Sequence, residues 1–109
     1  MRNNQLQTFS ERVLKIALAI PKGKITTYGR IACAAGAGPM ASQSITNILG
    51  KAYDKGVKNI PFHRIVYADG KVWLDDKHRK ERIALYKKEG IKLDKQDRII
   101  NFRDKLLEF

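Results

Sequence analysis

Apolar residues recur at helical spacing in the first part of the chain. They fall three or four positions apart, at Leu6, Phe9, Val13, Ile16, Ala17 and Ile20. This spacing is typical of an amphipathic helix with one face toward a core. The sequence Pro21-Lys22-Gly23-Lys24 is expected to end that helix, because proline and glycine both interrupt helical geometry.

Two shorter helices are expected next. Thr26 or Thr27 can cap a helix that begins near Tyr28, and Gly36 can close it in a left-handed conformation. After a turn, a second apolar stripe begins at Ala41, and Gly50 is expected to end that helix. Its other face is polar but uncharged, with Ser42, Gln43, Ser44, Thr46 and Asn47.

These two helices predict a helix-turn-helix. The second helix of such a motif must lie close to DNA, and a face of small hydrogen-bonding side chains allows this. An ordinary pair of packed helices is the alternative. The apolar pattern then changes to that of strands: residues 60–67 and 72–74 are expected to pair as a hairpin around the turn at Asp69-Gly70.

The remaining residues complete a small α+β fold. Asp75 or Asp76 can cap a helix that Gly90 ends, whereas the tail at 91–109 fits either a helix or a strand. The pattern as a whole predicts a mostly helical, winged helix-turn-helix-like fold, with residues 1–109 in a single domain.

Charge indicates the class of partner. The chain has 22 Lys and Arg against 11 Asp and Glu, a net charge of +11, and such a field favours a polyanion such as DNA. A basic but merely solvated surface is the alternative, because many of these residues stand beside acids.

Cys33 is the single cysteine, so neither an intramolecular disulfide nor a cysteine metal cluster is expected, and no cofactor is predicted. No apolar run reaches membrane-spanning length, which predicts a cytoplasmic protein without membrane contact.

Several motifs in order resemble one known family. They are residues 20–32 (IPKGKITTYGRIA), Gly36, Pro61-Phe62-His63-Arg64-Ile65-Val66, Asp69-Gly70 and Glu89-Gly90. Over residues 9–90 the chain resembles the DNA-binding domain of the O6-alkylguanine-DNA alkyltransferases, and most closely the alkyltransferase-like proteins that lack the acceptor cysteine. In the transferases that cysteine stands where this chain has Phe62. A phenyl ring cannot replace a thiolate nucleophile, so alkyl transfer by the family route is not expected.

The resemblance implies recognition of damaged DNA without reaction. Family members bind the minor groove through the helix-turn-helix and rotate the alkylated guanine out of the duplex. By position, Tyr28 matches the tyrosine that helps turn the phosphate, and His63 and Glu89 match the pair that activates the thiol in the transferases. The candidate lesion pocket is Phe62, His63, Arg64, Trp73 and Glu89. The candidate DNA-binding residues are Thr26, Thr27, Tyr28, Arg30, Ser42, Gln43, Ser44, Asn47 and Lys71.

Two departures from the family bear on flipping. The family arginine that fills the space left by the flipped base corresponds to Gln43, or to Ser42 if the turn is gapped differently. A glutamine is shorter than an arginine and uncharged, so it offers less stacking area and no charge. The loop after the wing holds Trp73 and two acids where the family has glycines.

The expected function is therefore non-enzymatic. The leading hypothesis is a monomeric protein that binds double-stranded DNA alkylated at guanine O6 in the nucleoid and marks it for another pathway, with nucleotide excision repair proteins as possible partners. The first alternative is a general winged-helix DNA-binding module that has lost lesion recognition. The second is an enzyme that transfers alkyl groups to Cys33 or hydrolyses a base with His63 and Glu89. Cys33 is expected to be buried between helices, which argues against the transfer.

Overall fold

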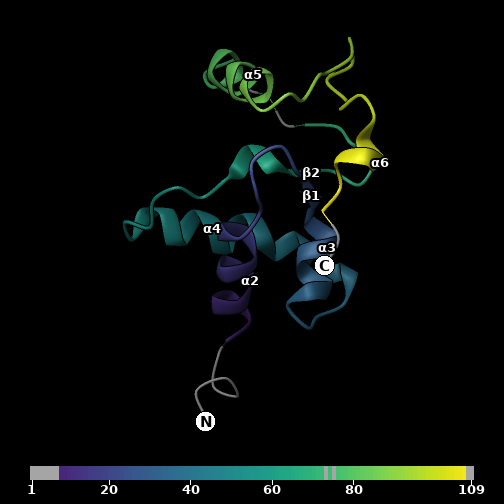
Figure 1. Ribbon diagram of the computed structural model, residues 1–109. Helices are drawn as coiled ribbons and strands as arrows, with labels where there is room; N and C mark the ends of the chain where they lie inside the picture. The colour runs from purple at the N-terminus through teal and green to yellow at the C-terminus, as the bar shows by residue number, and fades with distance from the viewer. Residues whose placement is uncertain (1–7, 73, 75, 108–109) are drawn as a thin grey trace. The chain divides into compact units, whose positions relative to one another are not determined.

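The structure, a computed structural model, describes residues 8–72, 74 and 76–107, and Figure 1 follows their order along the chain. The chain separates into two compact units. The helical unit comprises the described residues of Met1–Ala19 and Tyr28–Pro61, and the mixed unit those of Ile20–Thr27 and Phe62–Phe109. That the whole chain acts as one domain stays a prediction.

The helical unit begins with the expected amphipathic helix. Helix α2 spans Phe9–Leu18 and buries Val13 and Ala17 completely. Its first turn is closed by a capping box, in which the Thr8 hydroxyl accepts a hydrogen bond of 3.1 Å from the Glu11 amide. This arrangement satisfies amide groups that have no partner within the helix.

The helix-turn-helix follows in the same unit. Helix α3 spans Tyr28–Ala34, the 3-10 helix η1 spans Pro39–Ser44, and α4 spans Ile45–Asp54. Gly36 ends α3 with a φ of 95°, as predicted, because this left-handed conformation strains residues with a side chain. The prediction that Gly50 ends the second helix is wrong: α4 continues through Gly50, since an interior glycine costs a helix only about 1 kcal/mol.

The mixed unit contains a two-stranded parallel sheet. Strand β1 spans Thr26–Thr27 and β2 spans Ile65–Val66; Thr26 pairs with Ile65 and Thr27 with Val66. The two strands lie side by side in Figure 1, and both are buried. Strand β2 follows η2, a single 3-10 turn at Phe62–Arg64, where the sequence predicted a continuous strand.

The expected hairpin is wrong in its second strand. The turn forms as predicted, with hydrogen bonds from the Gly70 amide to the Tyr67 carbonyl and from the Tyr67 amide to the Lys71 carbonyl. Beyond it the chain leaves its predicted partner: Lys71 pairs with Arg98, and the Val72 amide donates to the Asp97 carbonyl. The tail therefore provides the partner that residues 60–67 were expected to supply.

The tail also completes the core of the mixed unit. This core is formed by Ile25, Val66, Val72, Tyr86, Ile91 and Ile99, with Leu74, Leu93, Phe102 and Leu106 packed against it. Helix α5 spans Arg79–Lys88, and the short α6 spans Phe102–Lys105. Helix α5 begins after His78, so the prediction that Asp76 caps it is wrong, and Asp75 lies outside the described residues. Five of these ten residues belong to the tail at 91–109, namely Ile91, Leu93, Ile99, Phe102 and Leu106, which assigns the tail a structural role.

Within the described residues, no helix is both long and apolar enough to cross a membrane.

Candidate lesion-recognition site

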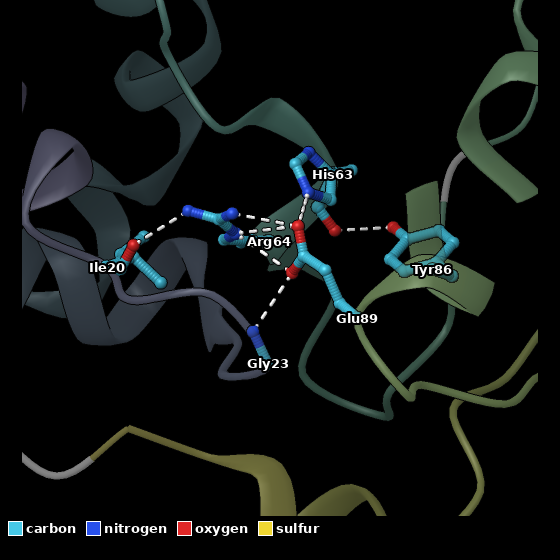
Figure 2. Close-up of polar contacts among 6 residues, drawn as sticks. All are labelled: Ile20, Gly23, His63, Arg64, Tyr86 and Glu89. Carbon is cyan, nitrogen blue, oxygen red and sulfur yellow. Dashed lines mark hydrogen bonds and ion pairs between the residues drawn. The ribbon is translucent and has the colours of Figure 1, made fainter. Parts of the chain in front are cut away.

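A single carboxylate organises the candidate site in the mixed unit. Glu89, which directly follows α5, accepts a hydrogen bond of 2.7 Å from His63 Nε2 at its Oε2 atom. Arg64 binds both carboxylate oxygens, with Nη2 2.8 Å from Oε2 and Nε 3.0 Å from Oε1. The Gly23 amide donates to Oε1 at 3.0 Å. Figure 2 shows these donors converging on the carboxylate from two segments of the chain.

The surroundings of Glu89 keep it ionised. Its side chain is only 3% exposed, and burial by itself raises the pKa of a carboxyl group. The hydrogen bonds from Arg64, His63 and the Gly23 amide outweigh burial and lower the pKa of Glu89 from 4.5 to about 2. The site therefore holds a fixed negative charge at neutral pH, compensated by the Arg64 guanidinium.

Further contacts hold His63 and Arg64 in place. Arg64 Nη1 donates to the Ile20 carbonyl at 2.9 Å. The Tyr86 hydroxyl donates to the His63 carbonyl at 2.5 Å, and the two rings meet edge to face at 5.8 Å between centroids. The Glu89 carboxylate and the Tyr86 ring thus restrict the His63 imidazole, while the Tyr86 hydroxyl holds the His63 backbone. Figure 2 shows the polar contacts.

Sequence reasoning found the histidine and glutamate but missed three partners. Ile20 and Gly23 contribute backbone atoms, which no side-chain pattern reveals. Tyr86 is not among the predicted site residues, although a buried tyrosine usually needs a partner for its hydroxyl. That requirement was the one signal that could have identified it.

Phe62 lies at the start of η2, immediately before this network. Its side chain is half-buried, as are those of His63 and Arg64. Of the predicted pocket, the structure brings together His63, Arg64 and Glu89, with Phe62 adjacent in the chain, whereas Trp73 lies outside the described residues.

A cavity of about 490 Å³ lies elsewhere in the mixed unit. It is located between α5 and residues 90–100, and Tyr86 and Ile91 are among its lining residues. Neither Phe62, His63 nor Glu89 lines this cavity. The sequence did not predict it, because it depends on the path of the tail.

Most predicted DNA-binding residues of the helical unit are accessible. Arg30, Gln43, Ser44 and Asn47 are exposed, while Tyr28 and Ser42 are half-buried. In the mixed unit, Lys71 is exposed. Their contacts with DNA stay predictions.

The prediction for Thr26 is wrong. Thr26 is 0% exposed and Thr27 8%, because both belong to the buried strand β1. A side chain without exposed surface cannot contact a phosphate, so Thr26 supports the fold and not the DNA interface. Thr27 retains too little surface for a major contact.

The prediction for Cys33 is also wrong. The sequence placed it between packed helices, but its side chain is exposed. Helix α3 instead buries Ile31 and Ala32. Cys33, the next residue along the helix, faces solvent. Among the described residues, no group of three or more His, Cys, Asp or Glu side chains could hold a metal ion.

Comparisons with known proteins agree with the predicted family and fold. Residues 8–91 match the family model for the 6-O-methylguanine DNA methyltransferase DNA-binding domain, close to the predicted boundaries of 9–90. A DNA base-flipping protein from Escherichia coli (strain K12) is 39% identical over 67 residues, and so is one from Shigella flexneri. Each match covers 62% of this chain and 50% of the relative, so the chain aligns with only half the length of these relatives.

Solved structures share the fold. The structure of S. pombe Atl1 in complex with damaged DNA containing O6-carboxymethylguanine matches with a TM-score of 0.70 and 21% identity, covering 100% of both chains. The structure of a Mycobacterium tuberculosis OGT variant matches with a TM-score of 0.58 and 29% identity, covering 76% of this chain and 48% of that one. The mostly helical α+β, helix-turn-helix-like fold predicted from the sequence is thereby confirmed.

Proposed function

Since the chain belongs to the family of the 6-O-methylguanine DNA methyltransferase DNA-binding domain, we propose that it recognises DNA alkylated at guanine O6 without repairing it. It binds the duplex through its helix-turn-helix, flips the altered base and holds it against Phe62. The complex then marks the lesion for another repair pathway.

One observation carries this proposal. The network around Glu89 is intact, with His63 at 2.7 Å and Arg64 at 2.8 Å from Oε2, yet the residue before His63 is Phe62. In the related transferases a histidine and a glutamate activate a thiol at this position. Here the supporting residues remain, while the reactive atom is replaced by an aromatic ring. A phenyl ring offers a base a stacking surface and no nucleophile.

The network serves binding in this proposal. Because Arg64 and His63 both bind Glu89, the backbone from Phe62 to Arg64 is held on one side by ionic hydrogen bonds and on the other by Tyr86. A rigid segment presents Phe62 with little loss of conformational entropy when a base arrives. The contacts that the flipped base makes with Phe62 then offset the few kcal/mol needed to unstack it.

The helical unit supplies the duplex contacts. The polar side chains Gln43, Ser44 and Asn47 are exposed around the start of α4, and the chain has a net charge of +11. Such a charge supports phosphate neutralisation, which strengthens at low salt. The E. coli and S. flexneri relatives are named DNA base-flipping proteins, and the S. pombe relative was solved with damaged DNA. These names support flipping by this chain.

The wider assignments extend the same proposal. The protein acts as a monomer and a single domain on nucleoid DNA in the cytoplasm, needs no cofactor, and passes the lesion to nucleotide excision repair proteins. A general DNA-binding module without lesion recognition is the second candidate. The helix-turn-helix favours this candidate, because Gln43, or Ser42 if the turn is gapped differently, stands where the family has an arginine that fills the space left by the flipped base.

A fluorescence titration separates the two. Duplexes with O6-methylguanine or guanine at one position are titrated with the protein at two salt concentrations. We expect affinity for the modified duplex to be higher at both, by about tenfold or more, and both affinities to fall as salt rises. Equal affinity for the two duplexes at both salts would exclude lesion recognition and leave the general module.

A further inference from the structure

Met40 has an unusual exposure for an apolar side chain. It is 83% exposed, more than any other large hydrophobic residue in the described part of the chain. The next in the helical unit are Tyr53 at 63% and Leu18 at 44%. Single exposed apolar residues are common on protein surfaces, so exposure becomes informative only through the location of Met40.

That location is beside Gln43. Both residues belong to η1, the 3-10 helix at Pro39–Ser44. Side chains three positions apart eclipse one another in a 3-10 helix, because it has three residues per turn. Met40 and Gln43 therefore form one row, and both are exposed. An α-helix from Ala41, as the sequence predicted, would have left Met40 outside the recognition helix.

The two side chains offer complementary chemistry. A flipped base leaves a gap in the stack and an unpaired partner base on the opposite strand. The Gln43 amide can donate and accept hydrogen bonds at that base, but it is small for the gap. Methionine is long, unbranched and polarisable, and proteins insert apolar wedges of this kind between bases.

We propose that Met40 is the wedge that enters the base stack at the flipped nucleotide, while Gln43 hydrogen bonds the orphaned base. This inference rests on the base-flipping step of the proposed function, because a wedge of this kind accompanies flipping. It divides between two residues the filling and the hydrogen bonding that one arginine performs in the related transferases. The ligand of this row is a duplex at the step next to the lesion.

Unstacking of a neighbouring base tests the wedge directly. The probe is a duplex with fluorescent 2-aminopurine directly 3′ to O6-methylguanine, and the matched duplex has guanine instead. Measurements use saturating full-length protein, so that affinity does not limit the signal. We expect the wild type to raise 2-aminopurine fluorescence, and Met40→Ala to reduce the rise by about threefold or more.

Three variants serve as controls. Met40→Leu keeps an apolar wedge and is expected to keep most of the signal. Gln43→Ala keeps the wedge and is expected to weaken binding while leaving the saturated signal largely unchanged. Leu18→Ala removes another exposed apolar side chain, on α2 of the same unit, and should change neither the affinity for the duplex nor the saturated fluorescence signal. Circular dichroism establishes that each variant is folded.

The outcomes separate the wedge from the proposed function. A folded Met40→Ala variant with the full wild-type signal would overturn the wedge, and so would a wild type that unstacks neither duplex. Lesion recognition is judged separately, by the affinity ratio of the two duplexes. A wild type with equal affinities but Met40-dependent unstacking supports the wedge and refutes lesion recognition. A higher affinity for the modified duplex, with unstacking that does not depend on Met40, supports lesion recognition and refutes the wedge.

Discussion

His63 and Glu89 lie 26 positions apart in the sequence, yet His63 Nε2 is 2.7 Å from Glu89 Oε2. The pair connects η2 to the residue that directly follows α5. Arg64 binds the same carboxylate, so one buried acid joins two segments of the mixed unit. The stability of that unit should therefore depend on Glu89.

Replacing Glu89 with glutamine should destabilise the protein. The amide keeps the shape of the side chain but leaves the Arg64 guanidinium without its counter-charge, and breaking a largely buried ion pair is costly. We expect a loss of about 2–3 kcal/mol in the free energy of unfolding, measured in urea. Glu81→Gln is the matched control, because Glu81 is exposed on α5, and it should change stability by less than about 0.5 kcal/mol. Equal effects of the two substitutions would refute the role given to the network.

The pH dependence of the unfolding free energy should reflect the ionisation of Glu89. Glu89 has a pKa of about 2 when folded and 4.5 without its partners. Its contribution is fully present above about pH 4.5 and is lost as the pH falls toward 2, because protonation then favours the unfolded chain. The full loss corresponds to about 3 kcal/mol.

The measurement is the free energy of unfolding at several pH values between 2 and 6, a range set by that pKa. Asp69 and Asp94 also have lowered pKa values, caused first by hydrogen bonds from the amides of Lys71 and Arg98. Both are exposed and can also contribute to the pH dependence, so the Glu89 part is the difference between wild type and Glu89→Gln. A difference that does not vary with pH would contradict the assignment.

Gly70 should not tolerate a side chain. Its φ is 85°, and an added Cβ would lie 3.1 Å from the Phe102 ring. Gly70→Ala should therefore cost about 1–3 kcal/mol of unfolding free energy, from backbone strain and displacement of the tail. Gly50→Ala is the control: nothing lies within 4 Å of its Cβ inside α4, so it should stabilise by about 0.5–1 kcal/mol. A neutral Gly70→Ala would show that Phe102 packs loosely on the turn.

Tyr28→Phe should affect only the modified duplex. The substitution keeps the ring and removes the hydroxyl that, by family position, helps turn the phosphate of the flipped nucleotide. We expect about tenfold weaker binding to an O6-methylguanine duplex and less than about twofold weaker binding to the unmodified one. Tyr53→Phe, at an exposed position on α4, is the control and should change neither. Equal small losses on both duplexes would support the general DNA-binding module.

Incubation with alkylated DNA should leave the protein unmodified. Intact-protein mass spectrometry after excess O6-methylguanine duplex is expected to show no added methyl group, since Phe62 has replaced the thiolate. Cys33 is exposed and is thus the thiol to examine, and Cys33→Ser should bind the modified duplex as the wild type does. A methyl group that maps to Cys33 would overturn the non-enzymatic proposal.

The sequence by itself determined the fold class, the order of the helix-turn-helix and the pairing of His63 with Glu89. The helices follow from local spacing and turn residues, such as the left-handed Gly36, because neighbouring side chains decide those conformations. The residues of the site followed from motifs matched in order, which depend on residue identity and not on geometry.

Only the tertiary structure decided which residues are buried and what pairs with the turn at Asp69-Gly70. Thr26 lies in a buried strand and Cys33 is exposed, because the orientation of each element within its unit determines which face is covered. Beyond the hydrogen-bonded turn, Lys71 and Val72 pair with Arg98 and Asp97 of the tail, since a strand of one or two residues has little intrinsic preference for a partner. The 3-10 geometry of η1, which aligns Met40 with Gln43, was likewise absent from the sequence pattern.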